Sequence, residues 1–243
     1  SGSFGNVYLK EWRRTKVAVK MLECNDALSM TLFNREFDIM TKMHHPNIVQ
    51  LLGYIEDPFA IIMEYLPGKS LADKKNMSWS QKKRLSLDVL RGLTYMHNRT
   101  PQQCIHRDIK PRNILFTLSG TAKIADMGLS KLISKSSSTD LYGMAAHSKD
   151  VGTRRYAAPE TQGDDSIYDS KVDIYSTGVM LYEVFENFCV FDGELKWALA
   201  PFAIRGILKN MTLLIPSERM SAIECYDMIS NINLSFLKKM FSY

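Results

Sequence analysis

The sequence contains few cysteines and no close pair of them. None of the four belongs to a Cys-x-x-Cys pair; they are Cys24, Cys104, Cys189 and Cys225. Structural zinc sites and disulfide frameworks are recognised from cysteines at characteristic short spacings. The sequence therefore predicts neither kind of site, and it favours a reducing, cytoplasmic location.

The sequence also lacks long apolar runs and a strong excess of either charge. A membrane-spanning helix needs about 18 or more consecutive apolar residues, whereas residues 179–191 are interrupted by Glu183 and Glu186. The 31 basic and 26 acidic residues give a net charge of +5, spread along the chain. We therefore expect no membrane span and no nucleic-acid binding, although the charge suits an anionic ligand. With 243 residues, 45% of them hydrophobic, the chain can form one large core or two modest ones.

The most informative residues lie in two short segments. Residues 104–115 are CIHRDIKPRNIL, and residues 126–128 are Asp-Met-Gly, each between apolar segments typical of short strands. Their polar side chains suit the binding of magnesium and a triphosphate beside a hydroxyl; these are Asp108, Lys110, Asn113 and Asp126. The two segments resemble the catalytic and metal-binding loops of eukaryotic protein kinases, whose patterns are H-R-D-L-x-x-x-N and D-F-G.

A strand lysine and a helix glutamate support this resemblance. Residues 16–22 alternate as a strand, which predicts Ala18 and Lys20 on one face. A strand lysine alone is usually a solvated edge residue. However, residues 32–43 have the apolar spacing of an amphipathic helix that contains Glu36. We expect Lys20 and Glu36 to form the ion pair on which protein kinases depend.

The first residues resemble part of another kinase motif. Ser-Gly-Ser-Phe-Gly at residues 1–5, followed by Val7, is similar to the end of the kinase glycine-rich loop. Gly2 and Gly5 would let the backbone approach the phosphates of a nucleotide, although a plain hairpin turn fits as well. The first glycine of that motif and the strand before it are missing, so we expect the chain to be a fragment of a longer protein.

The resemblance also implies a bilobal α+β fold. Residues 1–66 would form a small β-rich lobe and hinge, incomplete at its N-terminus, and residues 67–243 a larger, mainly helical lobe. Two further strands are expected at residues 48–54 and 60–64, leading to the hinge. Met63 would close the back of the adenine site, while backbone groups near Glu64 and Leu66 would bind the adenine edge.

Each motif residue receives a role by its position in the family pattern. Asp108 would accept or orient the proton of the substrate hydroxyl, and Lys110 would steady the transferred phosphate. Asn113 and Asp126 would hold Mg2+, and Lys20 would position the other phosphates of ATP. Val7, Ala18 and Leu115 would sandwich the adenine. An apolar stack would contain Met40, Leu51, His106 and Met127, where Met127 replaces the usual phenylalanine.

Helix signals dominate the second half of the chain. Capping boxes at residues 78–81 and 221–224 predict helix starts, and the second helix would bury Ala222, Cys225, Ile229 and Ile232. Asp173 opens an apolar helix and would brace the catalytic loop, and Glu160 would pair with Arg219. Arg219 follows Asp173 by only 46 positions. Because the resemblance implies a longer stretch here in protein kinases, a helix that often docks substrates or partners in that family would be reduced or absent.

The segment from residue 129 to residue 160 resembles a kinase activation segment. It ends in VGTRRYAAPE and contains many hydroxyl groups. A flexible polar linker is the alternative interpretation of the serine run. Because Arg107 precedes Asp108, we expect a phosphate on this loop to pair with Arg107 and activate the enzyme. Ser148 is the favoured site, and residues 136–139 are the second choice.

These observations predict an ATP- and Mg2+-dependent protein serine/threonine kinase. Lys110 and Thr153 resemble the serine/threonine branch, most closely its tyrosine-kinase-like group. Expected partners are a protein substrate and an activator, either an upstream kinase or a second copy acting in trans. A pseudokinase scaffold, tyrosine or dual specificity, and a small-molecule kinase remain as alternatives.

Overall fold

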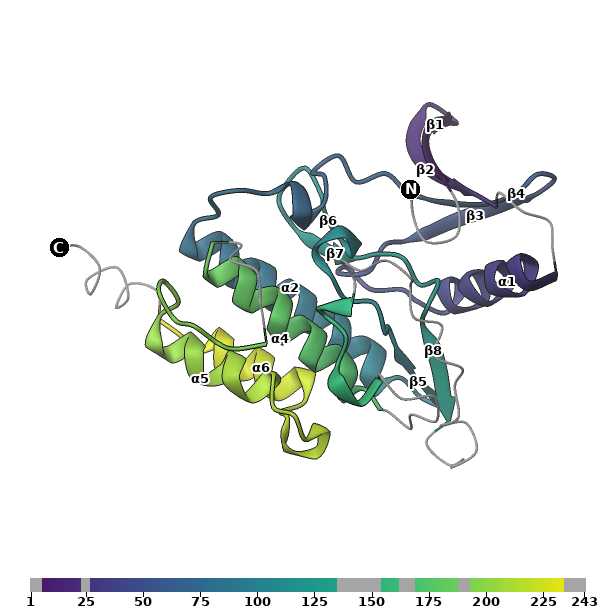
Figure 1. The fold of residues 1–243 in the computed structure, drawn as a ribbon. Helices are drawn as coiled ribbons and strands as arrows, with labels where there is room; N and C mark the ends of the chain where they lie inside the picture. Colours follow the sequence, from purple (N-terminus) through teal and green to yellow (C-terminus); the bar gives the residue numbers. More distant parts are fainter. Residues whose placement is uncertain (1–5, 23–26, 135–153, 162–168, 188–192, 234–243) are drawn as a thin grey trace.

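A computed structural model describes residues 6–22, 27–134, 154–161, 169–187 and 193–233. A four-stranded antiparallel sheet and the helix α1 (Ala27–Thr41) occupy one end of the molecule, and the other helices gather at the opposite end (Figure 1). The sheet order is β1-β2-β4-β3, with strands β1 (Asn6–Trp12), β2 (Thr15–Met21), β3 (Leu51–Glu56) and β4 (Phe59–Glu64). The fold is therefore α+β with a small sheet lobe and a larger helical lobe, as expected.

Strand β2 shows the predicted alternation of faces. Val17 and Val19 form a small buried cluster with Ala60, whereas Ala18 packs against the main core. Successive side chains of a strand point to opposite faces, which separates these neighbours. The predicted placement of Ala18 and Lys20 on one face is therefore supported.

The third strand begins later than predicted. We expected a strand over residues 48–54, but β3 begins at Leu51. Ile48 instead forms an isolated bridge with Ile124, and the N–H of Val49 donates to the Ile124 carbonyl at 2.9 Å. These residues join the sheet lobe to the helical lobe, because their backbone groups pair with a strand of the latter.

Two small antiparallel sheets frame the polar motifs. One pairs β5 (Gln102–Ile105) with β8 (Lys131–Ser134), and the other pairs β6 (Ile114–Phe116) with β7 (Ala122–Ile124). Strand β5 leads directly into His106, and β7 ends two residues before Asp126. The strands thus fix both ends of each functional loop.

Four helices form the frame of the larger lobe: α2 (Trp79–Asn98), α4 (Lys171–Phe185), α5 (Phe202–Met211) and α6 (Ala222–Ser230). Both predicted capping boxes are present, at Ser78 with Gln81 and at Ser221 with Glu224. Helix α4 is buried from residue 172 to residue 185, which matches its apolar sequence. Ile232, expected on the last helix, lies two residues beyond its end and is only partly buried.

Residues 193–201, described between α4 and α5, contain no helix. Residues 196–200 are instead fastened to the end of α4. The carboxylate of Glu186 accepts the N–H groups of residues 198, 199 and 200 at 2.8–3.0 Å. The hydroxyl of Tyr182 donates to the Lys196 carbonyl at 3.0 Å and accepts its N–H at 3.1 Å. Hydrogen bonds to α4 thus order a segment that has no secondary structure of its own.

Four short 3-10 turns complete the described structure: η1 (Leu71–Asp73), η2 (Pro111–Asn113), η4 (Pro159–Thr161) and η5 (Pro216–Glu218). None of the described helices is both long and apolar enough to cross a bilayer.

Candidate active site

Lys20 is the centre of a charged cluster drawn from three elements. Its ammonium donates to both carboxylate oxygens of Glu36 at 2.7 Å and to Asp126 Oδ1 at 3.0 Å. Lys20 comes from β2, Glu36 from α1, and Asp126 from the loop after β7. The structure therefore brings together the predicted pair and also adds Asp126, a contact that the sequence did not reveal.

Lys20 and Asp126 stabilise each other's charged form, whereas burial and the charge of Asp126 raise the pKa of Glu36. Burial alone would lower the pKa of Lys20, but the carboxylates of Glu36 and Asp126 outweigh it and raise that pKa. Burial would raise the pKa of Asp126, yet the ammonium of Lys20 holds it below its ordinary value. Both groups are therefore charged at neutral pH.

Asp108, Lys110 and Asn113 form a second cluster. The ammonium of Lys110 lies 2.8 Å from Asp108 Oδ2, and the Asn113 amide donates to the same oxygen at 2.9 Å. Asn113 also donates to the Asp108 carbonyl at 2.8 Å, which closes the loop on itself. All three side chains are buried. Burial raises the pKa of Asp108, and Lys110 opposes part of that rise.

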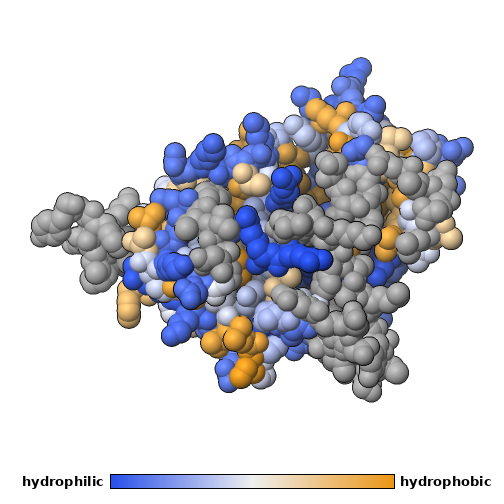
Figure 2. Space-filling view, viewed as in Figure 1, coloured by the Kyte–Doolittle hydropathy of each residue, from blue (hydrophilic) through white to orange (hydrophobic). Residues whose placement is uncertain are grey.

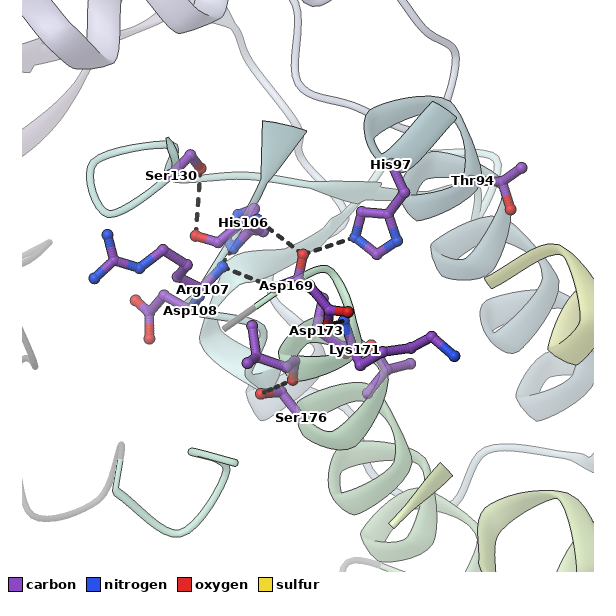
Figure 3. A network of polar contacts seen from close by, with 12 residues as sticks. Thr94, His97, His106, Arg107, Asp108, Ser130, Asp169, Lys171, Asp173 and Ser176 are labelled. Atoms are coloured by element: carbon purple, nitrogen blue, oxygen red, sulfur yellow. Dashed lines mark hydrogen bonds and ion pairs between the residues drawn. The ribbon is translucent and has the colours of Figure 1, made fainter. Parts of the chain in front are cut away.

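Asp173 holds the backbone that carries Asp108. From the start of α4, its carboxylate accepts the N–H groups of His106 and Arg107, each at 2.8 Å, and Nε2 of His97 at 2.8 Å. Figure 3 shows these groups converging on Asp173, while the side chains of Arg107 and Asp108 extend away from it. Asp173 therefore braces the catalytic loop, as predicted.

Each of the two functional loops contains a residue with an unusual backbone conformation. Arg107 has φ 71° and Asp126 has φ 64°, both in the left-handed region that non-glycine residues rarely adopt. Such residues persist only where their surroundings hold them, and they concentrate at functional sites. At Arg107 the Asp173 carboxylate supplies that support.

The pKa of Asp173 reflects this arrangement. Complete burial would raise it, but the hydrogen bond and charge of His97, with smaller contributions from His106, hold it below its ordinary value. The carboxylate is therefore ionised although no part of it meets solvent.

Residues of the predicted stack around Met127 are buried or pack against the main core. Met127 and Met40 belong to one buried cluster, against which Leu51 packs. The buried His106 ring donates from Nε2 to the Ala125 carbonyl at 3.1 Å and accepts the Asp108 N–H at Nδ1 at 3.2 Å. The thioether of a methionine can adapt to fill such a site.

A contact that we did not predict links α1 to the segment that follows Asp126. The guanidinium of Arg35, next to Glu36, donates to the Ser130 carbonyl at 2.7 Å. The Ser130 hydroxyl in turn donates to the His106 carbonyl at 3.3 Å. The sequence offered one signal, the position of Arg35 beside Glu36, but it did not identify the partner.

The residues expected to contact adenine lie around β2, β4 and β6. Met63 is buried and pairs with Ala18 across the sheet, Leu66 is buried, and Leu115 is half-buried. Val7 is 50% exposed and pairs with Lys20. Val7, Ala18 and Met63 therefore lie on the strand of Lys20 or on the strands paired with it. Leu115 lies on β6 of the helical lobe, where it forms a bridge with Ser70. The Glu64 N–H donates to the Gln50 carbonyl at 3.0 Å, and the Glu64 carboxylate pairs with Lys123 at 2.6 Å.

Two ion-pair groups fasten the end of the activation segment. Arg219 is almost fully buried and donates to both oxygens of Glu160, at 2.6 and 2.8 Å, as predicted. The Tyr156 hydroxyl donates to Glu183 on α4 at 2.7 Å and accepts from Arg155 at 2.6 Å. Burial, with Glu183, raises the pKa of Tyr156, which therefore stays a neutral donor.

Several predicted residues lie outside the described part of the chain. These are Gly2, Gly5, Ser148, residues 136–139 and Thr153.

Asn113 and Asp126 provide the kind of oxygen ligands that suit magnesium. Among the described residues, no group of three or more His, Cys, Asp or Glu side chains could hold a metal alone. Mg2+ commonly binds through one or two protein oxygens together with phosphates and waters. Because both amide N–H contacts of Asn113 go to Asp108, its Oδ1 is the atom suited to a cation.

Comparison with known proteins adds evidence independent of this geometry. The model of the protein kinase domain family matches residues 1–243. The serine/threonine-protein kinase VIK of Arabidopsis thaliana is 36% identical over 97% of this chain and 56% of its own length. A probable serine/threonine-protein kinase of Dictyostelium discoideum, drkB, is 34% identical over 84% of the chain and 28% of its own length. Chitin elicitor receptor kinase 1 of A. thaliana is 37% identical over 75% of the chain and 29% of its own length. The chain thus spans about half, or less, of these curated relatives.

Proposed function

Because the chain belongs to the protein kinase domain family, we propose that it transfers the γ-phosphate of ATP to serine or threonine hydroxyls of proteins. The observation that carries this proposal is the contact of Lys20 with both Glu36 and Asp126, at 2.7 and 3.0 Å. These charges come from three separate elements and are held as the reaction requires. Relatives named as serine/threonine kinases support the choice of hydroxyl.

Asp108 would meet the incoming hydroxyl. Its carboxylate is buried with a raised pKa, which makes it a better proton acceptor than an ordinary aspartate. The ammonium of Lys110, 2.8 Å away, would neutralise charge on the phosphate as it moves toward the hydroxyl. The protein itself forms no covalent bond to the transferred phosphate. Positioning of the reactants and stabilisation of charge would therefore account for most of the rate enhancement.

Lys20, held in place by Glu36, would position the α- and β-phosphates of ATP. Asn113 and Asp126 would hold Mg2+, which neutralises phosphate charge and bridges phosphate oxygens when bound. The adenine would lie among Val7, Ala18, Met63, Leu66 and Leu115, and its edge would bind backbone groups near Glu64 and Leu66. The backbone at Gly2 and Gly5 would approach the phosphates and complete the proposed ATP site.

We also propose that the domain divides after residue 66, into lobes of residues 1–66 and 67–243. The last strand of the large sheet ends at Glu64, and the helical lobe follows. The buried thiols of Cys104 and Cys225 favour a cytoplasmic location, because a reducing environment keeps such residues unpaired.

Regulation by phosphorylation of the activation loop remains part of this proposal. Ser148 is the favoured site, and residues 136–139 are the alternative. Arg107, whose side chain extends away from Asp173 in Figure 3, would contribute to binding the phosphate. The modifying enzyme would be an upstream kinase or a second copy in trans. Mass-spectrometric mapping of active protein tests this, and full activity without any loop phosphate contradicts it.

A phosphate-transfer assay tests the main proposal. The protein is incubated with labelled ATP, Mg2+ and a generic basic protein, and the product is hydrolysed for phosphoamino-acid analysis. We expect phosphoserine and phosphothreonine. Phosphotyrosine would instead support tyrosine or dual specificity.

The Asp108→Asn variant distinguishes the enzyme from a pseudokinase scaffold. Loss of a positioned proton acceptor typically costs about 10²–10⁴ in rate, so we expect transfer to fall by that factor. The matched control is Asp38→Asn, which changes an exposed carboxylate on α1. Equal transfer by wild type and Asp108→Asn would contradict the assignment of Asp108.

A further inference from the structure

The catalytic segment carries one exposed cation close to Asp108. In the turn η2 (Pro111–Asn113), Pro111 and Asn113 are buried, and only Arg112 is exposed. Four residues span at most about 14 Å even when fully extended, so the backbone of Arg112 lies within that distance of Asp108. A protein substrate whose hydroxyl reaches Asp108 would therefore lie within about four residue lengths of the Arg112 backbone.

Two lysines of the segment after the hinge belong to the same region. The Lys69 carbonyl accepts the Phe116 N–H at 3.0 Å, and the Gly68 N–H donates to the Phe116 carbonyl at 2.9 Å. The ammonium of Lys74 lies 5.0 Å from the centre of the Phe116 ring. These contacts set the segment of Lys69 and Lys74 against β6, which directly follows the turn that contains Arg112.

A glycine makes this close packing possible. A Cβ at Gly68 would lie 2.5 Å from the Phe116 carbonyl oxygen, nearer than any side chain can stand. The backbone of the segment is therefore pressed against β6. We call Lys69, Lys74 and Arg112 the basic rim.

The carboxylates near the basic rim already have ion-pair or hydrogen-bond partners. Asp108 pairs with Lys110, Asp126 with Lys20, and Glu64 with Lys123. Asp73 accepts the hydroxyl and N–H of Ser70 at 2.6 and 3.1 Å. Its pKa is lowered, chiefly by those hydrogen bonds and less by the charges of Lys69 and Arg112.

Neither Lys69 nor Arg112 forms an ion pair with any residue in the described ranges, and both are exposed. The basic rim thus has three cations against one acid, which leaves an excess of positive charge facing solvent. A partner with negative charge would complete it.

We propose that the basic rim selects protein substrates that carry anionic side chains near the acceptor hydroxyl. This inference rests on the proposed function, because it assumes that the hydroxyl meets Asp108. An extended peptide advances about 3.3 Å per residue, so anionic residues two to four positions from the acceptor would reach the basic rim. Such residues are Asp, Glu or a phosphorylated side chain.

Competition between peptides tests the inference. Peptides share one acceptor serine and carry glutamate, phosphoserine, alanine or lysine two to four positions away on either side. We expect kcat/KM for the glutamate peptide to exceed that for the alanine peptide about tenfold, since each exposed charge pair contributes little and several add up. A further gain for phosphoserine would identify prior phosphorylation as the source of the charge.

Charge-reversed variants locate the effect. In Arg112→Glu and Lys69→Glu the ratio of kcat/KM between the glutamate and alanine peptides should fall by about threefold or more. The matched control Lys209→Glu changes an exposed lysine on α5 and the same net charge, so the ratio should stay as in wild type. High salt should also reduce the ratio, because the Debye length falls to about 3 Å at 1 M.

Three outcomes would overturn the inference. They are equal use of the glutamate and alanine peptides, a preference for lysine, or an equal fall of the ratio in Lys209→Glu. Phosphorylation of all peptides at similar rates would support the kinase activity and reject only the proposed role of the basic rim in substrate selection. Absence of transfer to every peptide and to the generic protein would reject the proposed function itself.

Discussion

Asp108 combines two opposing influences within one side chain. Burial raises its pKa, which favours proton acceptance, while Lys110 lowers it through a hydrogen bond and its charge. The ammonium of Lys110 lies in direct contact with this carboxylate, at 2.8 Å. The balance between the two determines the pH at which Asp108, the proposed base, becomes ionised, so altering Lys110 should move that pH.

Replacing Lys110 by methionine should shift the acid limb of the pH–activity profile. A general base works only when ionised, so kcat/KM rises as pH passes through the pKa of the free enzyme's base. Without Lys110 the pKa of Asp108 should rise further above its ordinary value of 3.8, and the acid limb should move to higher pH. Profiles of kcat/KM for wild type and Lys110→Met provide the measurement, and an unmoved limb would argue that Asp108 is not the base.

The single side chain of Arg35 connects helix α1 to a neighbouring loop. Its bond to the Ser130 carbonyl couples α1 to the segment after Asp126, beside the Lys20–Glu36 pair. Hydrogen bonds from charged groups contribute about 1.5–3 kcal/mol. Arg35 is therefore a positioning residue, because it touches none of the reacting groups.

The Arg35→Ala variant should lose about tenfold in kcat, since α1 would spend less time with Glu36 at Lys20. Arg35→Lys, which keeps a cation, should recover part of the loss. Hydrogen exchange of α1 should quicken in Arg35→Ala, and the exposed neighbour Asn34→Ala is the control. Unchanged exchange together with unchanged kcat would show that the bond has no positioning role.

Helix α4 acts as the anchor of the larger lobe. Its first turn supplies Asp173 to the catalytic loop, its middle supplies Glu183 to Tyr156, and its end supplies Glu186 to residues 198–200. Every side chain from residue 172 to residue 185 is buried. One central helix thus holds three separate loops, because each of its acids accepts hydrogen bonds from a different one.

Replacing Asp173 by asparagine should destabilise the protein by about 3–5 kcal/mol, the typical cost of breaking a buried charged pair. An amide cannot accept the N–H groups of His106 and Arg107 and the His97 ring together. Urea unfolding measures the loss, and Asp227→Asn, an exposed carboxylate on α6, is the control. A loss no larger than that of the control would contradict the bracing role.

The loss should depend on pH in a defined direction. The pKa of Asp173 is lowered in the folded protein, so its contribution is fully present above the unfolded value of about 3.9. It disappears as pH falls through the folded pKa. The difference in unfolding free energy between wild type and Asp173→Asn should therefore narrow below about pH 4.

Contacts between the two lobes would link the proposed nucleotide binding to overall stability. Lys20 and Glu36 belong to the sheet lobe, whereas Asp126 follows β7 of the helical lobe. The bridge from Ile48 to Ile124 joins the same parts. A ligand that engages both lobes should therefore stabilise the protein as one unit.

The surface in Figure 2 mixes hydrophilic and hydrophobic residues, with no single apolar face over the described residues in that view.

ATP with Mg2+ should raise the melting temperature by about 5–10 °C at 100 times its Kd, a gain of about 2.7 kcal/mol. Removing Mg2+ with a chelator should reduce the shift, because Asn113 and Asp126 would lose their proposed ligand. Lys20→Met should abolish most of it. Differential scanning fluorimetry gives the measurement, and an equal shift in wild type and Lys20→Met would contradict the phosphate-binding role of Lys20.

Much of the fold and site followed from patterns that are local in the chain. The alternation along residues 16–22 separated the two faces of β2, and the capping boxes at residues 78–81 and 221–224 marked true helix starts. These signals succeed because hydrogen bonds and side-chain directions within a few residues decide them. Family resemblance supplied the long-range pairs Lys20–Glu36 and Glu160–Arg219, both of which formed.

Other features depended on which distant elements pack together. Arg35 and Ser130 are 95 residues apart, Lys20 and Asp126 are 106 apart, and His97 and Asp173 are 76 apart. No periodicity within one segment identifies such partners, since a buried polar group bonds whatever the fold sets beside it. Residues 48–49 are the clearest case. Their apolar sequence suits the large sheet, yet they pair with Ile124 because the packing of the two lobes sets that strand against them.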